Sequence, residues 1–293
     1  MVQSFPLVTI IAISYNHEEF LEETLESIKN QTYGNIELII LDAFSKDQSV
    51  SKINSWLQRN PEVEAKTIFQ AETKKITANA NEALELATGE FYQILSCDDV
   101  LLSDKIESQV KVFQDSDENL GVVYCDASKI DQESNEIDQP TFFAERNWKS
   151  ESQLPSGMIF PLLLTDYFIT APSVLVRKSM AMEVGGYNSE VMMEDLDLFL
   201  KMAQKFSFKG LFQIGVKYRI LETSLLRSTD PFNRQSNRLK IYASYLGQKG
   251  EWDRFITHQF LLAYQGKSTF YKLVFSIYAG LQKFLRTKFK KHY

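Results

Sequence analysis

The chain has 293 residues, 44% of them hydrophobic and 13% aromatic, which is enough to bury a core in one large domain, with or without an extension. Its net charge of -6 excludes a protein built to coat nucleic acid, and no apolar run reaches the ~20 residues that a membrane-spanning helix needs. Two cysteines and three scattered histidines argue against a disulfide framework or a zinc site, and favour a reducing, cytoplasmic setting.

Short apolar runs and amphipathic stretches alternate through the first hundred residues. Helical spacing of apolar residues predicts helices that follow the first three runs, and Asn16 is the expected N-cap of the first helix. This alternation is typical of right-handed βαβ units with a parallel sheet. The apolar runs predict buried strands over residues 7–14, 36–42, 64–71 and 90–96.

The second half of the chain predicts fewer elements and one long polar segment. Strands are expected over 120–131, 173–177 and 209–221, and an amphipathic helix over 192–206. Residues 131–155 indicate a loop, interpreted as a mobile flap, in which Phe142, Phe143 and Trp148 contact either an acceptor or the body of the protein. The expected division is a catalytic domain over 1–225 and a helical extension over 226–293.

Polar residues stand at the ends of three predicted strands, at Ser14, Asp42 and Asp98. Ligands of parallel sheets bind beyond the carboxyl ends of the strands, so these residues predict a crevice that holds a ligand. The adjacent carboxylates of Asp98 and Asp99 repel each other, which indicates a cation nearby. The alternatives are a solvated acidic turn at Asp98, and a helix-capping role for Asp42 and for Asp195.

The chain lacks the common nucleotide and hydrolase motifs. No G-x-G-x-x-G follows the first strand, and neither G-x-x-x-x-G-K-[ST] nor G-x-S-x-G occurs. The candidate functional residues of the chain are instead carboxylates at strand ends and in a second acidic cluster at residues 193–197. Such residues suit metal-assisted transfer, in which Asp98 or Asp99 holds Mg²⁺ or Mn²⁺ and Asp195 or Glu194 accepts a proton from an attacking hydroxyl.

Four stretches, in order, resemble family 2 glycosyltransferases of the bacterial surface-polysaccharide type. They are "VTIIAISYNHEEFLEETLESIKNQTY", "IELIILDAFSKDQS", "NANEALELATGEFYQILSCDD" and "SVLVRKSMAMEVGGYNSEVMMEDLDLFLKMA". The resemblance covers residues 5–225 and implies the GT-A fold, an α/β architecture with a Rossmann-like, mostly parallel central sheet flanked by helices. It also implies an inverting, metal-dependent hexosyl transfer from a nucleotide diphosphate sugar, most simply a UDP-sugar, to a saccharide or lipid-linked hydroxyl.

The resemblance also implies roles for particular residues. Asp195 would be the catalytic base with Glu194 beside it, and Asp98 and Asp99 would bind ribose and Mn²⁺ or Mg²⁺. The donor would be bound by Ser14, Tyr15, Asn16, Asp42, Asn81 and Asp98.

This sequence departs from the family pattern at three places. Ser96 stands where the family has the first acid of Asp-x-Asp, and Ala43 and Phe44 replace Asp-Gly after the nucleoside acid. The family's late histidine is absent, and Arg219 or Arg227 would supply charge to the diphosphate instead. Two rival functions stay open: a non-catalytic nucleotide-sugar-binding or scaffolding protein, and a sugar nucleotidyltransferase.

The last 24 residues, 270–293, combine a helical apolar stripe with basic side chains. One interpretation is a helix that binds the anionic inner face of the plasma membrane, which would make the enzyme peripheral. The other is a helix packed on the catalytic domain with a solvated basic tail.

Overall fold

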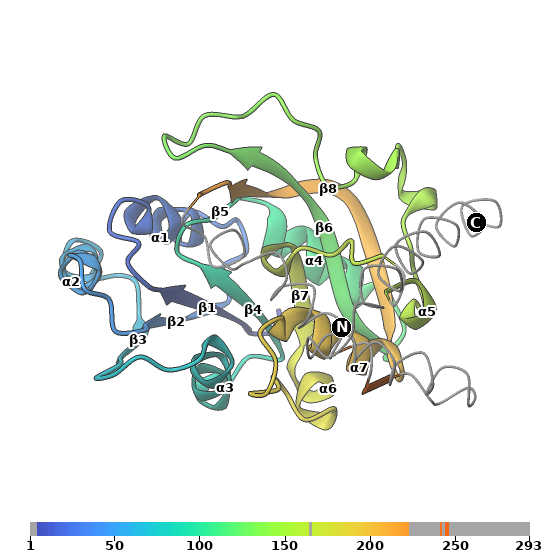
Figure 1. The fold of residues 1–293 in the computed structure, drawn as a ribbon, viewed down its shortest axis with the longest axis horizontal. Helices are drawn as coiled ribbons and strands as arrows, with labels where there is room; N and C mark the ends of the chain where they lie inside the picture. The colour runs from blue at the N-terminus through green and yellow to red at the C-terminus, as the bar shows by residue number, and fades with distance from the viewer. Residues whose placement is uncertain (1–4, 164–165, 223–240, 242–243, 246–293) are drawn as a thin grey trace, which may run out of the picture.

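The computed structural model describes residues 5–163, 166–222, 241 and 244–245, and Figure 1 shows a central sheet with helices on both faces. The predicted α/β class is confirmed. The strands are β1 (Val8–Ser14), β2 (Ile36–Asp42), β3 (Ala65–Phe69), β4 (Phe91–Ser96), β5 (Val100–Leu101), β6 (Leu120–Ile130), β7 (Val174–Arg177) and β8 (Ser207–Arg219). The α-helices are α1 (Leu21–Lys29), α2 (Ser49–Arg59), α3 (Ile76–Leu86), α4 (Lys105–Gln114), α5 (Phe160–Leu163), α6 (Lys178–Glu183) and α7 (Glu194–Ala203), and the short 3-10 helices are η1 (Ala144–Arg146), η2 (Glu151–Gln153) and η3 (Ala171–Ser173).

The eight described strands form one sheet in the order β3-β2-β1-β4-β7-β6-β8-β5. Strands β1 to β4 are parallel, as the βαβ pattern predicts, and β6 pairs parallel with β8. The sheet is mixed because β7 runs antiparallel between β4 and β6, and β5 runs antiparallel to β8. The parallel half therefore places the carboxyl ends of β1, β2 and β4 at one edge.

Alternating side chains along the strands divide the core between the two faces of the sheet. In β1, Ile10 belongs to the core cluster that includes residues of α1, α2 and α4, whereas Ile11 belongs to the cluster that includes residues of α3, α6 and α7. Trp56 of α2 is fully buried and donates its indole N–H to Glu26 of α1 at 2.7 Å. Because strands buried on both faces have no solvent-facing side chain, they appear in the sequence as unbroken apolar runs.

The predicted N-cap at Asn16 is wrong. Helix α1 begins at Leu21, and Asn16 lies in a left-handed conformation with φ 55°. Its side-chain oxygen accepts the backbone N–H of Lys46 at 2.8 Å, and its own N–H donates to Ser45 at 2.8 Å. Asn16 therefore joins the β1–α1 loop to the β2–α2 loop, which sequence spacing within one helix does not reveal.

The polar segment 131–155 packs against the body of the protein. Of the two interpretations of its aromatic residues, the structure favours contact with the body over contact with an acceptor. Phe143 is 2% exposed and packs edge-on against Tyr124 and Trp148. Arg146 pairs with Asp166 through two hydrogen bonds. Phe143 and Trp148 thus pack in the core cluster beside α5 and α7, whereas Phe142 packs against Tyr218 on the other face of the sheet.

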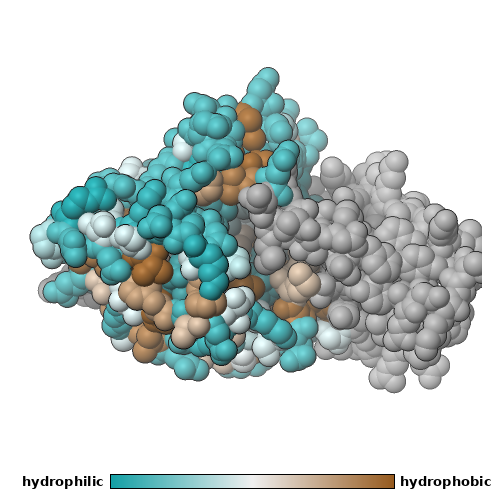
Figure 2. All heavy atoms as spheres, turned by 60° about the vertical axis from the view of Figure 1, so that its left-hand side comes forward, coloured by the Kyte–Doolittle hydropathy of each residue, from teal (hydrophilic) through white to brown (hydrophobic). Residues whose placement is uncertain are grey.

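Three residues of the predicted extension, Ile241, Ser244 and Tyr245, lie within the described part of the chain. Ile241 is 1% exposed and belongs to the core cluster that includes α7, and the Tyr245 hydroxyl donates to the backbone oxygen of Asp197 in α7 at 3.4 Å. The prediction for residues 270–293 lies outside the described residues. Across the described residues, no helix is long and apolar enough to cross a membrane, and the face in Figure 2 is mostly hydrophilic with small apolar patches.

Arg219, the last residue of β8, ties the carboxyl edge of the sheet together. Its side chain is fully buried, pairs with Glu23 of α1 at 2.6 Å, and lies over the Phe20 ring. Every nitrogen of the guanidinium donates a hydrogen bond, so this cation is committed to the fold. The other acceptors are the backbone oxygens of Asp98, Asp131 and Gln132 and the hydroxyl of Ser134.

Replacing Arg219 by Met is expected to lower the free energy of unfolding by about 3 kcal/mol, because buried acceptors and Glu23 lose their donor. A matched control is the ion pair made by Glu22, the residue next to Glu23 on α1, with Arg59 of α2. Arg59 pairs with Glu22 at 2.8 Å, but their side chains are 57% and 52% exposed. Arg59→Met should therefore cost less than about 0.5 kcal/mol. Urea unfolding measures both, and equal midpoints for the two variants would contradict the assignment.

Candidate active site

The carboxyl ends of β1, β2 and β4 lie side by side, as the sequence predicts for a parallel sheet. Ser14 is in register with Asp42, and Ile13 with Ser96. The backbone N–H of Cys97 continues the pairing by donating to Ile13 at 2.9 Å. The segment that carries Asp98 therefore leaves the sheet directly beside Ser14.

Asp42 is 1% exposed and organises the loop that follows β2. Its carboxylate accepts the backbone N–H of Ser45 at 2.8 Å and the Ser45 hydroxyl at 2.5 Å. Phe44 bridges the two in a left-handed conformation, with φ 72°. The neighbouring rings of Tyr15 and Phe69 are 47% and 41% exposed. A buried acceptor with exposed aromatic rings nearby suits the recognition of a planar, hydrogen-bonding group.

Three buried polar atoms at this edge have no hydrogen-bond partner among the described residues. They are the hydroxyl of Ser14, Nδ1 of His17 and Oδ1 of Asp98. Leaving such atoms unpaired costs stability, so their gathering at one edge indicates a place where a ligand supplies the missing partners.

His17 is the site residue that sequence reasoning missed. Its place in the sequence, shortly after the first predicted strand, indicates the first turn of a helix and no role in chemistry. The structure places it before α1, where burial lowers the pKa of its imidazole while the charges of Asp98, Asp47 and Asp42 oppose that shift. These acids come from two other segments, the end of β2 with its following loop and the turn after β4, so no local spacing in the sequence could have shown their approach to His17.

The two adjacent aspartates have separate surroundings. Asp99 is 4% exposed and its Oδ1 accepts the backbone N–H of Arg219 at 2.9 Å. Burial, reinforced by the neighbouring Asp98, holds the pKa of Asp99 well above its usual range. These surroundings favour the neutral form of Asp99, which lessens the like-charge repulsion expected from the sequence. Asp98 keeps the oxygen that has no partner.

Asn81 of α3 binds the protein backbone with both ends of its amide. Nδ2 donates to the carbonyl of Tyr187 at 2.8 Å, and Oδ1 accepts the N–H of Tyr187 at 3.1 Å. The predicted contact of Asn81 with a sugar-phosphate would use the second N–H of Nδ2 or the second lone pair of Oδ1. Its visible role is to hold the loop that precedes α7.

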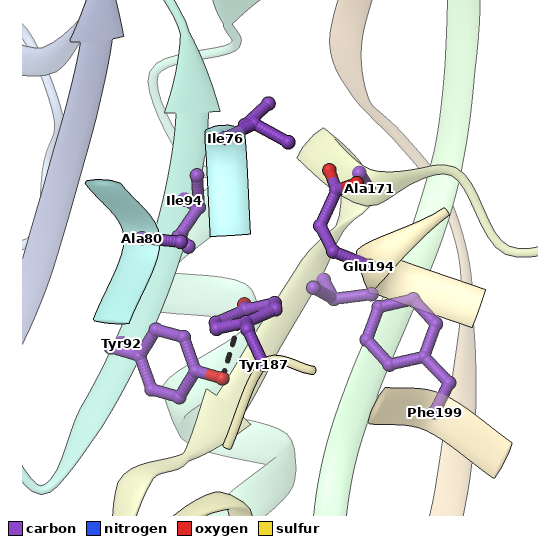
Figure 3. A pocket seen from close by; sticks show the side chains of 9 residues that line it. Ile76, Ala80, Tyr92, Ile94, Ala171, Tyr187, Glu194 and Phe199 are labelled. Atoms are coloured by element: carbon purple, nitrogen blue, oxygen red, sulfur yellow. Dashed lines mark hydrogen bonds between the residues drawn. The ribbon is translucent and has the colours of Figure 1, made fainter. Parts of the chain in front are cut away.

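The acidic cluster of residues 193–197 opens α7. The carboxylate of Asp195 accepts hydrogen bonds from the Tyr167 hydroxyl and from the backbone N–H of Leu196 at 2.7 Å. Glu194 lines a cavity of about 40 Å³ between α3, β4 and α7 (Figure 3). Burial, with the charge of Asp195 second, raises the pKa of Glu194 to about 8.

Arg219 and Arg227 are the residues suggested to replace the missing histidine, and only Arg219 lies among the described residues. Arg219 is fully committed to backbone and Glu23, so it does not supply charge to a ligand. Arg227 lies outside the described residues. Among the residues that the structure describes, no group of three or more His, Cys, Asp and Glu is arranged to hold a metal ion by itself.

The chain matches known proteins in sequence. A model of the family described as glycosyl transferase family 2 matches residues 9–184. An uncharacterized glycosyltransferase of Rickettsia typhi is 25% identical, covering 87% of this chain and 78% of that protein. Another, of Methanocaldococcus jannaschii, is 24% identical over 94% of this chain and 89% of its own length. A third, of Haemophilus influenzae, is 33% identical over 46% of this chain and 52% of its own length.

Two solved structures share the fold. TarS 1–349 of S. aureus in complex with UDP-GlcNAc superimposes with a TM-score of 0.64 and 16% identity, covering 81% of this chain and 66% of that one. The mannosyltransferase PcManGT from Pyrobaculum calidifontis, in complex with GDP-Man and Mn²⁺, gives 0.59 and 16% identity over 99% of this chain and 81% of that one. At such identity the likeness shows the fold, which is the GT-A arrangement expected from the sequence.

Replacing Ser14 by Ala is expected to raise the free energy of unfolding by about 0.5–1 kcal/mol, because it removes a buried hydroxyl with no partner. Ser173 provides the matched control, since it is equally buried but donates to the Thr170 carbonyl at 2.7 Å. Ser173→Ala should cost about 1 kcal/mol. Thermal unfolding without added ligand distinguishes the two signs, and a loss at Ser14 equal to that at Ser173 would contradict the assignment.

Proposed function

The chain belongs to glycosyl transferase family 2, and we propose that it transfers a sugar from a nucleotide diphosphate sugar to an acceptor hydroxyl with inversion of configuration. The observation that carries the proposal is the row of unpartnered polar atoms at Ser14, His17 and Asp98, beside the buried carboxylate of Asp42. Polar groups left unpaired at the carboxyl edge of a parallel sheet are a prepared ligand site.

The nucleoside would occupy the part of this edge nearest β2. Asp42 offers an acceptor for a base N–H, and Tyr15 offers an exposed aromatic face. Asn16 would act mainly through its backbone and side-chain bonds to the β2–α2 loop, which fix the conformation of Asp42's partner Ser45. A uracil base is the simplest candidate, and the complexes of the two structural neighbours with UDP-GlcNAc and GDP-Man make UDP and GDP the nucleotides to compare.

A divalent cation fits the residues present, with Asp98 rather than Asp99 as its protein ligand. Oδ1 of Asp98 is a hard oxygen without a partner, whereas Asp99 is buried against the backbone of β8. Mn²⁺ or Mg²⁺ commonly takes one or two carboxylates and completes its shell with phosphate oxygens and water. When bound, such an ion would neutralise the charge that develops on the departing diphosphate.

Asp195 would serve as the base. The acceptor oxygen attacks the anomeric carbon, the bond from that carbon to the diphosphate oxygen breaks, and Asp195 takes the hydroxyl proton. Tyr167 donates to Oδ2 of Asp195 and so positions the carboxylate without contacting the reacting atoms. A single displacement inverts the anomeric centre and needs no covalent intermediate.

The acceptor is proposed to be a saccharide or a lipid-linked saccharide in the assembly of a bacterial surface polysaccharide. That role would suit a cytoplasmic enzyme held on the inner face of the plasma membrane through residues 270–293. A non-catalytic nucleotide-sugar-binding protein with the same fold is the rival function, and it is distinguished by turnover rather than by binding.

Calorimetric titration with UDP and GDP, each with and without Mn²⁺, tests the donor site. We expect UDP binding that Mn²⁺ tightens, and loss of that enhancement in Asp98→Ala, because the variant removes the oxygen assigned to the cation. Asp195→Asn should keep donor binding but lose at least 100-fold in turnover. Wild-type protein that binds no nucleotide under any of these conditions refutes the donor site, and binding without turnover supports the rival function.

Tyr167→Phe tests the positioning of the base. We expect turnover to fall about tenfold with the KM for the donor nearly unchanged, because only the orientation of Asp195 is lost. Tyr33→Phe is the control, since the Tyr33 hydroxyl donates to Pro6 before the start of β1, at the opposite edge of the sheet. A rise in KM without a fall in turnover would argue against this role.

A further inference from the structure

The two acidic residues that open α7 have different partners. Asp195 accepts hydrogen bonds from Tyr167 and Leu196, which favour its charged form. Glu194 extends into the cavity described above, as Figure 3 shows, and no other side chain of the described residues donates a hydrogen bond to it. Neighbouring carboxyl groups in unlike surroundings are a known way to divide acid and base roles within one site.

The walls of the cavity are almost entirely apolar. Apart from Glu194, the polar groups of the lining are two hydroxyls, those of Tyr92 from β4 and Tyr187 from the loop before α7, which share one hydrogen bond of 3.2 Å, and in Figure 3 the Glu194 carboxyl points away from them, toward Ile76 and Ala171. One bond uses only one of their two protons, so the other is free to point into the cavity. The remaining lining residues are Ile76, Ala80, Ile94, Ala171, Val174 and Phe199.

The charges around Glu194 disfavour its ionised form. The lining residues from α3, η3 and β7 are not titratable. Tyr92 lies in β4 and Tyr187 in the loop before α7, and Asp195 of α7 contributes a charge of the same sign as an ionised Glu194. The helix N-terminus and the backbone N–H of Glu194 act in the opposite sense. Desolvation outweighs them, and the pKa of about 8 leaves the carboxyl group mostly protonated at pH 7.

On the premise of the proposed glycosyl transfer, we propose that Glu194 acts as a neutral acid that donates a hydrogen bond to an oxygen of the bound sugar. Asp195 alone then carries the negative charge and accepts the proton. The cavity of about 40 Å³ has space for a small polar group such as one hydroxymethyl, but not for a sugar ring. The substrate class is therefore a sugar that presents such an oxygen to Glu194 in a water-poor site.

An ionised Glu194 would fail in two respects. It would have no proton to donate, and it would place a second negative charge next to the base and near the departing diphosphate. Transfer should therefore decline as the pH rises through about 8, where Glu194 ionises. The structure thus predicts an alkaline limit on activity that belongs to Glu194 rather than to Asp195.

Carbon-13 NMR of the full chain labelled at the glutamate carboxyl carbons tests the protonation state without any substrate. We expect one resonance that titrates near pH 8 and is missing in Glu194→Gln, while Glu190→Gln, an exposed change in the preceding loop, leaves it in place. A Glu194 resonance that titrates below pH 6 overturns the proposal.

Release of nucleotide diphosphate, followed from pH 6 to 9.5, tests the role in transfer. Wild type and Glu190→Gln should lose activity above about pH 8. The activity of Glu194→Gln at pH 7 should be less than tenfold below that of wild type and should not decline above pH 8, because its amide donates a hydrogen bond at every pH. An alkaline limb that persists in Glu194→Gln, or a loss as large as that of Asp195→Asn, overturns the proposal. Absence of nucleotide binding in the wild type would instead refute the proposed function, so the two failures are distinguishable.

Discussion

The guanidinium of Arg219 is enclosed by acceptors from three segments that are far apart in sequence, and the site depends on this enclosure. Through it the end of β8 holds the backbone of Asp98, the start of the segment after β6, and Glu23 of α1. Asp99 completes the arrangement by accepting the backbone N–H of the same arginine. A buried cation tolerates few alternative arrangements of its acceptors, so the turn after β4 is held in one geometry and Asp98 is kept at the carboxyl edge.

The fixed turn explains how two adjacent aspartates can end a buried strand. Burial favours the neutral form of Asp99, whereas Asp98 keeps an unpartnered oxygen at the proposed ligand site. The same division recurs at the start of α7, where Glu194 is protonated by its surroundings and Asp195 is held by Tyr167. In both pairs, tertiary packing separates two chemically similar carboxyl groups into different electrostatic states.

The site is built at a cost in stability. Ser14, His17 and Asp98 bury polar atoms that no described residue pairs, although the core around them is closely packed on both faces of the sheet. A protein selected for stability alone would pair these atoms or remove them. Their retention beside Asp42 agrees with a site whose ligand supplies the partners, as expected for a nucleotide diphosphate bound at the edge of a GT-A sheet.

The sequence determined the elements whose cause is local or periodic. Apolar runs located β1, β2 and β4, helical spacing located α2 and α3, and the βαβ alternation placed Ser14, Asp42 and Asp98 at one edge. It did not determine the start of α1, the role of His17 or the commitment of Arg219, because each depends on groups that come together only through tertiary contacts. The difference between Asp98 and Asp99, and between Glu194 and Asp195, was likewise decided by the fold. Protonation follows burial and neighbouring charge, and the order of residues along the chain specifies neither.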